Sequence, residues 1–222
     1  MTTAVLVVAK MPVPGEAKTR LAAHVGDARA AELAAAALLD TLAAVVAADL
    51  PCVVALTGDL RRAARRPELE SALAATTVVP QRGDTFAGRL TAAHHDTARL
   101  LPRHRVLQIG MDTPQVTAGL LDTSARRLEA LDAVVGPATD GGWWALGVAR
   151  PQLTDRLIDV PMSQPDTGRA TVTMLRHQRA RIGGLAELRD VDTFDDACAV
   201  AADPQCGPRF AAAVAELAVD AR

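Results

Sequence analysis

The sequence predicts an α/β fold with a mainly parallel central sheet and helices on both of its faces. Short Val-rich apolar segments alternate along the chain with Ala- and Leu-rich segments of helical periodicity. Polar segments that contain Gly and Pro follow the expected strands, as ligand-binding loops do in such sheets. The chain has 222 residues and no visible linker or repeat, so we expect residues 1–222 to form a single domain.

The expected strands are short apolar runs, of which the first, residues 3–9 (TAVLVVA), is typical of a strand buried on both faces. The other six are expected at residues 52–56, 77–79, 105–109, 133–136, 143–148 and 185–189. Helical spacing predicts helices at residues 27–48, 61–73 with an interruption at Pro67, 89–101, 117–131 and 165–181, and a mostly helical remainder to residue 218. Ser163 is the expected N-cap of the 165–181 helix, with Pro165 at its start.

Charge and composition argue against several classes of partner. The formal net charge of −2 provides no field that would draw the chain onto nucleic acid or an anionic membrane. No apolar run approaches transmembrane length, and residues 1–12 lack the features of a secretory signal. Cys52, Cys198 and Cys206 form no CxxC pair, which favours buried free thiols in a reducing compartment. We therefore expect a cytoplasmic protein with small-molecule partners; its oligomeric state does not follow from the sequence.

Lysine is nearly absent from the chain. Of the 24 basic residues 22 are arginine, and the two lysines, Lys10 and Lys18, lie eight residues apart in the first loop. Tyr and Asn are absent as well, which indicates a coding bias without functional meaning at most positions. The survival of two lysines in one loop therefore points to a function there.

That first loop, residues 10–20, has the features of a phosphate-binding loop. Pro14 and Gly15 favour a turn in which glycine supplies a positive φ. Backbone N–H groups of such a turn, with Lys10, Lys18 and Arg20, could hold a di- or triphosphate. The alternative is a solvated basic loop.

A P-loop is excluded in this segment. Ala17, Lys18 and Thr19 resemble the GK[ST] end of a Walker A motif, and we count Thr19 among the candidate phosphate-binding residues. The motif would need glycine at positions 12 and 17, where the chain has Pro and Ala.

Asp112 lies in the sequence Gly-Met-Asp-Thr-Pro directly after the 105–109 strand. A carboxylate at a strand end points into the crevice where ligands bind, and it could hold Mg²⁺ or Mn²⁺ against phosphate oxygens. The alternative is that Asp112 or Thr113 caps the helix that starts near Thr117.

The segment Asp140–Trp144 combines an acid, two glycines and both tryptophans of the chain. Gly141 and Gly142 would let the backbone approach a ligand closely. Trp143 could stack on a sugar or base, although strand alternation makes one of the two tryptophans a core residue. Asp140 is a candidate for binding substrate, with a plain turn role as the alternative.

The late acidic segment, residues 190–196, has two explanations. Thr193 with Asp196 fits an N-terminal capping box, and Asp195 suits the helix dipole. Neither explains Asp190 or Asp192, which precede the cap, so Asp192 is a candidate second metal ligand.

The loop after the 77–79 strand supplies the remaining candidates. Gln81 could read a base edge and Arg89 could meet a carboxylate or phosphate, and we count Gly83 with them as nucleotide-binding. An exposed loop followed by an arginine-bearing helix is the alternative. His94 and His95 are adjacent on a helix and cannot share a face, which argues against a metal pair.

Together these segments resemble a bacterial family of the GT-A, or nucleotide-diphospho-sugar transferase, superfamily. Members of that family carry AKxPxPGxxKTRL, GxDxP, GPAxDGG and DVDT motifs, and this chain has them in order at residues 9–21, 110–114, 136–142 and 190–193. The match spans almost the whole chain. Members are commonly described as glycosyltransferases, some of them associated with arsenosugar biosynthesis, and they are similar to guanylyltransferases of cofactor pathways.

The resemblance implies a Rossmann-like GT-A sheet and a role for several residues. Asp112 stands where the superfamily has its metal-binding acid, and Asp192 where nucleotidyltransferases have a second metal carboxylate. Lys18 and Arg20 stand where those enzymes bind phosphates. The chain departs from the family at Trp143, where Tyr is usual.

A second departure is the pair Met162-Ser163, where the family usually has Trp-Ser. Both departures bear on the identity of the acceptor more than on the donor chemistry.

The leading hypothesis is a metal-dependent transferase that uses an activated nucleotide. In a glycosyl transfer, Asp112 would hold the metal on the diphosphate of an NDP-sugar, and Asp140 would bind or deprotonate the hydroxyl of a small acceptor. In a nucleotidyl transfer, a phosphorylated acceptor would attack an NTP while Lys18 and Arg20 neutralise the triphosphate. The family description favours the first reaction, and the lysine loop with Asp192 favours the second. A non-catalytic nucleotide-binding protein is the remaining alternative.

Overall fold

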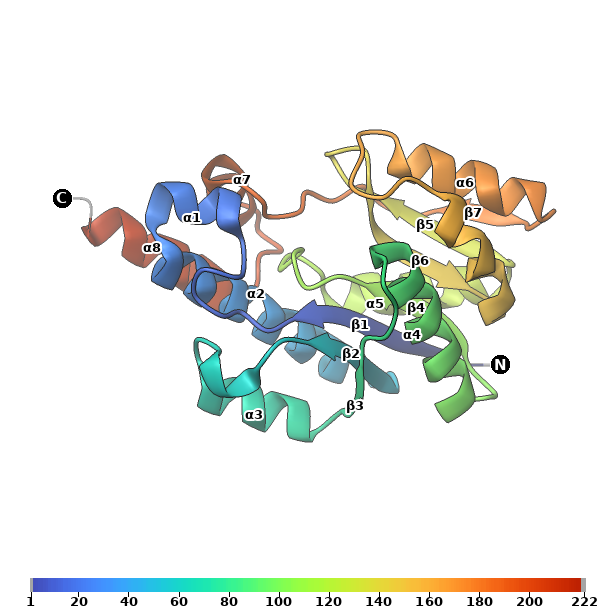
Figure 1. Ribbon diagram of the computed structural model, residues 1–222, viewed down its shortest axis with the longest axis horizontal. Coiled ribbons are helices and arrows are strands. Elements are labelled where there is room, and N and C mark those ends of the chain that lie inside the picture. The colour runs from blue at the N-terminus through green and yellow to red at the C-terminus, as the bar shows by residue number, and fades with distance from the viewer. Residues whose placement is uncertain (1, 221–222) are drawn as a thin grey trace.

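The computed structural model describes residues 2–220, which form one seven-stranded sheet between two layers of helices (Figure 1). The strands lie in the order β3-β2-β1-β4-β6-β5-β7. Their bounds are Thr3–Lys10 (β1), Cys52–Thr57 (β2), Thr77–Pro80 (β3), Arg105–Ile109 (β4), Ala133–Pro137 (β5), Trp143–Val148 (β6) and Ile182–Gly184 (β7). The predicted α/β fold with a mainly parallel sheet is therefore confirmed.

One strand runs against the others. β6 is antiparallel to both of its neighbours, β4 and β5, whereas the remaining pairs are parallel. The start of β6 therefore lies at the same edge of the sheet as the carboxyl ends of β1 and β4. This reversal brings the turn at residues 138–142 to the edge where ligands bind in α/β sheets.

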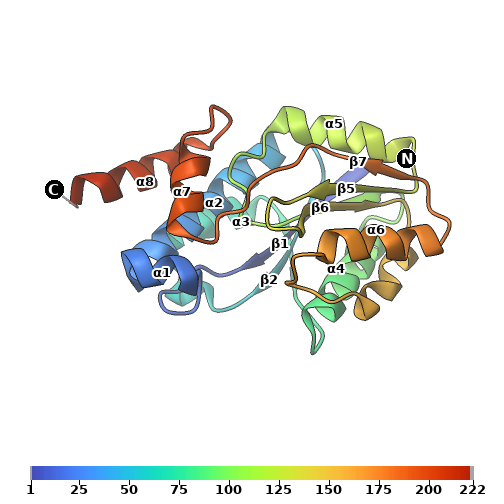
Figure 2. The ribbon, with the colours of Figure 1, turned by 90° about the horizontal axis from the view of Figure 1, so that it is seen from above.

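Helices cover both faces of the sheet (Figure 2). α2, α3 and α5 pack on one face, α4, η2 and α6 pack on the other, and α1, α7 and α8 form a third cluster with the first half of α2. The α-helix bounds are Thr19–Val25 (α1), Asp27–Ala47 (α2), Arg66–Ala74 (α3), Phe86–Leu100 (α4), Ala118–Glu129 (α5), Thr167–His177 (α6), Phe194–Ala201 (α7) and Pro208–Asp220 (α8). Two 3₁₀ helices span Leu60–Arg62 (η1) and Pro151–Asp159 (η2).

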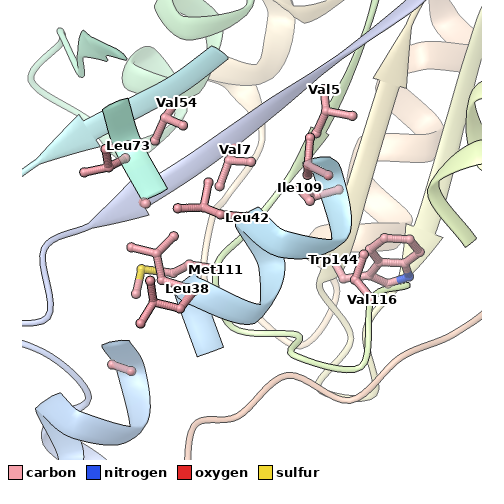
Figure 3. Close-up of a cluster of buried hydrophobic side chains, with 14 of the residues drawn as sticks. Val5, Val7, Leu38, Leu42, Val54, Leu73, Ile109, Met111, Val116 and Trp144 are labelled. Carbon is pink, nitrogen blue, oxygen red and sulfur yellow. The ribbon is translucent and has the colours of Figure 1, made fainter. Parts of the chain in front are cut away.

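α2 is long and apolar enough to cross a membrane by length and composition, so the expectation that no run approaches that length is wrong. In the fold, 72% of the apolar window of α2 is buried. Leu38 and Leu42 of this helix pack against Val5 and Val7 of β1 in the core (Figure 3). The composition of α2 is thus explained by burial against the sheet.

The expectations for two proline-containing segments need correction. Pro67 does not interrupt a helix; it lies in the first turn of α3, where the missing N–H leaves no bond unmade. α6 begins at Thr167 rather than residue 165, with Asp166 at the N-cap position. Ser163 has φ 58° and lies in the loop before the helix.

The last strand is also displaced from its predicted position. β7 covers residues 182–184 rather than 185–189, because Gly183 and Gly184 pair with β5 despite their low strand propensity. Of the predicted range, Leu188 forms an isolated bridge with Ala138. Two helices, α1 and η2, were not predicted from the sequence.

Residues 185–193 form a crossing segment that returns from β7 to α7 over the edge of the sheet (Figure 2). Along its course Thr139 N–H donates to Leu188 O at 3.0 Å and Val191 N–H donates to Asp112 O at 2.9 Å. The crossing segment is thereby fixed to the carboxyl end of β4.

The cysteines are free, as predicted, but their burial differs from the expectation. Cys52 and Cys206 are half-buried and Cys198 is exposed.

Candidate active site at the carboxyl ends of β1 and β4

A cavity of about 720 Å³ opens at the carboxyl ends of β1 and β4. Its walls come from the ends of β1, β2 and β4 with the loops that follow them, the loop after β3 with the start of α4, the start of β6 with the turn before it, the loop before α6, and the crossing segment. Of the predicted site residues, those that line it are Lys10, Arg20, Gln81, Arg89, Asp112, Asp140, Gly142, Trp143 and Asp192. Residues from both ends of the chain thus meet in one cavity.

The other predicted site residues do not line this cavity: Gly15, Lys18, Thr19, Gly83 and Gly141. Gly15 has the expected positive φ of 77° in its turn. Lys18 lies behind the two carboxylates described next.

Lys18 joins the two predicted metal carboxylates. Its Nζ lies 2.9 Å from Oδ1 of Asp112 and 2.9 Å from Oδ1 of Asp192, and its side chain is 12% exposed. Burial lowers the pKa of Lys18, but the charges of Asp112 and Asp192 together outweigh burial and hold the pKa above its ordinary value. The ammonium therefore remains charged between two anions.

The backbone presents Lys18 to this position. Lys18 is at the N-cap of α1 in the left-handed region, with φ 50° and ψ 49°, a conformation uncommon for a residue other than glycine. Arg20, two residues on, is far more open: its side chain is 78% exposed and its Nη1 lies 3.7 Å from Oδ2 of Asp192. Lys10, the other lysine, is exposed and donates from Nζ to Glu16 O at 2.6 Å.

Gln81 spans the carboxyl ends of two strands. Its Nε2 donates to Ala9 O at 2.9 Å and to Ala55 O at 3.0 Å. Carbonyl oxygens only accept hydrogen bonds, so the two contacts require the NH₂ end of the Gln81 amide to face the strands. The other end, Oε1, remains an acceptor, and Gln81 lines the cavity.

Four aspartates line the cavity, since Asp140 and Asp190 join Asp112 and Asp192 in its wall. Burial, with the nearby charge of Asp140, raises the pKa of Asp190 to about 6. Asp140 is oriented by the backbone, since its Oδ1 accepts from Gly142 N–H at 2.7 Å.

The two tryptophans divide as strand alternation requires. Trp144 is 3% exposed in the core and donates from Nε1 to Ala186 O at 2.8 Å. Trp143 is half-buried, lines the cavity, and donates from Nε1 to Thr171 Oγ1 at 3.2 Å. Both tryptophans contribute to the cavity wall, and Trp143 is the more exposed of the two.

Gly141 has a structural role that the sequence analysis did not foresee. Its φ is +89°, and a Cβ there would lie 1.9 Å from Pro165 O. Gly168 N–H donates to Gly141 O at 2.9 Å. The loop before α6 can approach Gly141 closely because glycine has no Cβ. The 138–142 turn and this loop therefore form one continuous wall of the cavity.

The capping box at α7 is present as predicted. Thr193 Oγ1 accepts from the N–H of Asp196, and the Asp196 side chain accepts from the N–H of Thr193. Asp192, just before the box, is left free of capping and pairs with Lys18.

Asp112 and Asp192 fit a divalent cation. Both direct an oxygen at one cationic centre, the Lys18 ammonium, and carboxylate oxygens are the ligands that Mg²⁺ and Mn²⁺ prefer. Among residues 2–220, no three His, Cys, Asp or Glu side chains form a ready-made metal site. A metal held by these two carboxylates would therefore need further oxygens from a ligand or from water.

Three parts of the cavity were missed from the sequence. Asp190 was noted as unexplained by the cap but given no role. The loop at residues 162–167 was assigned to a helix start, although its positive-φ Ser163 lines the cavity. Gln108, in the middle of β4, also lines the cavity; its Oε1 lies 2.9 Å from Nε2 of buried His94. Burial lowers the pKa of His94 to about 4, so His94 is neutral and can donate to Gln108.

The fold is that of the nucleotide-diphospho-sugar transferases and nucleotidyltransferases. A candidate nucleotide-diphospho-sugar transferase from Desulfovibrio desulfuricans G20 is similar to 98% of this chain and 99% of its own, with 24% identity and a TM-score of 0.79. Rv0371c from Mycobacterium tuberculosis H37Rv, solved in complex with manganese, matches 90% of this chain and 98% of its own, with 20% identity and a TM-score of 0.52. A cytidylyltransferase from Leptospira borgpetersenii matches 100% of this chain and 95% of its own, with 11% identity and a TM-score of 0.50.

Within that class of fold, the chain belongs to the family described as "Uncharacterized protein conserved in bacteria (DUF2064)", which it matches over residues 38–164. No curated protein matches the chain. The resemblance to a bacterial GT-A-type family stated from the motifs is confirmed at the level of family and fold.

Proposed function

We propose that this chain is a metal-dependent transferase that moves a glycosyl group from an NDP-sugar to the hydroxyl of a small acceptor. The observation that carries the proposal is the lining of the cavity, which combines the basic side chains of Lys10, Arg20 and Arg89 with four aspartates. A nucleotide diphosphate suits the basic side chains, and a metal and an acceptor hydroxyl suit the aspartates. The fold shared with nucleotide-diphospho-sugar transferases supports the same reading.

The donor nucleotide occupies the side nearest β1, β2 and α4. Lys10, Arg20 and Arg89 place positive charge around the cavity and would neutralise the diphosphate. Gln81 offers its fixed Oε1 to an N–H group on the edge of the base.

Asp112 and Asp192 hold the metal in this proposal. A bound Mg²⁺ or Mn²⁺ supplies charge neutralisation to the departing diphosphate. The manganese complex of a protein with the same fold supports a divalent cation, without distinguishing the two metals.

The acceptor lies between the 138–142 turn and the loop before α6. Asp140 binds the acceptor hydroxyl, and Trp143 packs against a sugar face. Asp190, whose raised pKa makes it a stronger base than an ordinary aspartate, takes the hydroxyl proton. The bond from the sugar to the diphosphate breaks as the acceptor oxygen bonds to the sugar, and the proton passes from Asp190 to solvent.

A nucleotidyl transfer from an NTP to a phosphorylated acceptor is the second candidate. The two carboxylates that share one cation, Asp112 and Asp192, favour it. The acidic acceptor side opposes it, because Asp140 and Asp190 would repel an acceptor phosphate. Glycosyl transfer to a neutral hydroxyl therefore agrees better with the charges.

The test combines binding with product analysis. Calorimetry with panels of NDP-sugars and NTPs, with and without Mn²⁺, identifies the donor. Since the acceptor is not identified, slow hydrolysis measures turnover, with release of a nucleoside diphosphate expected from an NDP-sugar. Metal-dependent release of pyrophosphate from an NTP would instead support nucleotidyl transfer, and metal-dependent binding without turnover would support a binding protein.

A matched pair of variants links turnover to the site. Asp112→Asn is expected to abolish metal-dependent hydrolysis with the fold retained. Asp159→Asn, which changes an exposed acid paired with Arg156 on η2, is the control. Wild-type turnover in Asp112→Asn would contradict the proposed metal role.

A further inference from the structure

The Lys18 ammonium lies between Asp112 and Asp192, the two carboxylates proposed to hold the metal. Its Nζ is 2.9 Å from Oδ1 of each carboxylate. A divalent cation bound by both of these oxygens would need to stand between them, at about 2.1 Å from each if it is Mg²⁺. A metal and an ammonium cannot share that space, both because of their size and because their charges repel.

The backbone of Lys18 is fixed in the fold, whereas its side chain can change conformation. Its side chain is 12% exposed, and its backbone is fixed at the start of α1. The four-carbon side chain can rotate while the helix stays in place. The positive charge of Arg20, by contrast, is 78% exposed and meets only one of the two carboxylates, at 3.7 Å.

We propose that Lys18 occupies the metal position in the nucleotide-free protein, so that the divalent cation is bound firmly only together with the nucleotide. In this scheme, which rests on the proposed function, the ammonium moves from the carboxylates to the nucleotide phosphates as the metal enters. Each arriving charge then meets a partner: the metal takes Asp112 and Asp192, and the phosphates take Lys18. Nucleotide and metal must therefore increase each other's affinity by the same factor.

The first experiment measures Mn²⁺ binding by electron paramagnetic resonance without nucleotide, for the wild type, Lys18→Met and Arg20→Met. Lys18→Met keeps the side-chain length and removes the charge between the carboxylates. It is expected to bind Mn²⁺ at least ~10-fold more tightly than the wild type. Arg20→Met removes one charge from the same loop and is the matched control, with a change below about threefold.

The same titrations are repeated with inorganic pyrophosphate, UDP and GDP, with correction for the metal that each binds in solution. In the wild type these ligands are expected to tighten Mn²⁺ binding. In Lys18→Met the tightening is expected to be smaller, because displacement of the ammonium no longer contributes.

A second experiment uses the wild type and does not depend on the folding of a variant. The chain has two lysines, so selective lysine ¹³C labelling gives two side-chain signals, from Lys10 and Lys18. Mg²⁺ with UDP or GDP is expected to move the Lys18 signal, and Mg²⁺ alone at the same concentration is expected to leave it in place. Calorimetry shows whether Mg²⁺ alone binds at Asp112, because that heat signal would be lost in Asp112→Asn. If Mg²⁺ alone binds there while the Lys18 signal stays in place, the inference is overturned.

The outcomes separate this inference from the proposed function. Equal Mn²⁺ affinities for wild type and Lys18→Met would overturn the inference and leave a metal-dependent transferase intact. Equal gains in Lys18→Met and Arg20→Met would also overturn it, because they would indicate a general charge effect. Absence of Mn²⁺ binding in all three proteins, with and without nucleotide, would remove the proposed function as well.

Discussion

The contact between Gly141 and Pro165 leads to a prediction about the wall of the cavity. In Gly141→Ala, the new Cβ would lie 1.9 Å from Pro165 O, whereas real Cβ atoms keep at least 3.0 Å. The φ of +89° adds backbone strain of about 1–2 kcal/mol for any residue with a Cβ. The 138–142 turn and the loop before α6 must therefore move apart by at least about 1 Å in the variant.

The magnitude follows from what that separation breaks. Gly168 N–H donates to Gly141 O at 2.9 Å, and loss of this bond costs about 1 kcal/mol. With the strain, the free energy of unfolding is expected to fall by about 2–3 kcal/mol. For a chain of this size that corresponds to a fall in Tm of roughly 4–12 °C.

The assay is thermal and urea unfolding of Gly141→Ala beside Gly184→Ala. Gly184 is the control because it has no atom within 4 Å of an added Cβ and no positive φ. The control is expected to change stability by less than about 0.5 kcal/mol. If Gly141→Ala proves as stable as Gly184→Ala, the close contact does not exist and the reasoning is refuted.

Three further predictions concern single side chains of the cavity. The pKa of Asp190 is raised to about 6, so its contribution to stability is greatest below its ordinary pKa near 4 and is lost as pH rises through 6. Asp190→Asn is therefore expected to be more stable than the wild type by about 1–2 kcal/mol at pH 7.5, allowing for partial solvent screening, and to show little difference at pH 4.5 in urea titrations; an equal difference at both pH values would contradict this origin. Gln81→Glu would set a carboxylate against Ala9 O and Ala55 O, and a loss of about 2–3 kcal/mol is expected by urea unfolding. The control is Gln205→Glu, the same change at an exposed glutamine, with an expected loss of less than about 1 kcal/mol; equal losses would contradict the argument. Lys18→Arg keeps the charge but replaces a compact ammonium with a planar guanidinium, so the fold is expected to survive by circular dichroism while most turnover is lost, and full activity would mean that the lysine is not specifically required.

Much of the fold was accessible from the sequence because buried strands carry a strong local signal. The apolar runs at β1, β2 and β4 contain β-branched residues, the run at β6 contains two tryptophans, and the structure places all four strands within one residue of the prediction. The position of β7 was predicted wrongly because Gly183 and Gly184 lack the apolar side chains that indicate a strand in a sequence. Their pairing with β5 is decided by tertiary contacts.

The direction of β6 was not predicted, although a signal existed. Only five residues, 138–142, connect β5 to β6, and a parallel crossover needs a dozen or more. The short connection therefore indicates that β6 is antiparallel to β5, which places Trp143 at the edge of the sheet where ligands bind.

The candidate site was predictable in its residue types and less so in its contacts. Strand-end acids and the two lysines stood out from their neighbours, and most of the candidates do line one cavity. No local pattern indicates that Lys18 meets Asp192, 174 residues later in the chain, or that Asp190 lies near Asp140. Such pairs arise only when the crossing segment docks onto β4.

That docking has a consequence for when the protein becomes competent during synthesis. The crossing segment completes the cavity, yet the six strands from β1 to β6 are already made by residue 148. A nascent chain that ends near residue 148 contains most of the sheet together with Asp112 and the basic residues of the cavity. Asp190 and Asp192 have not yet been added at that stage. Function would then appear at a late and sharply defined length of chain, after most of the hydrophobic core has been enclosed.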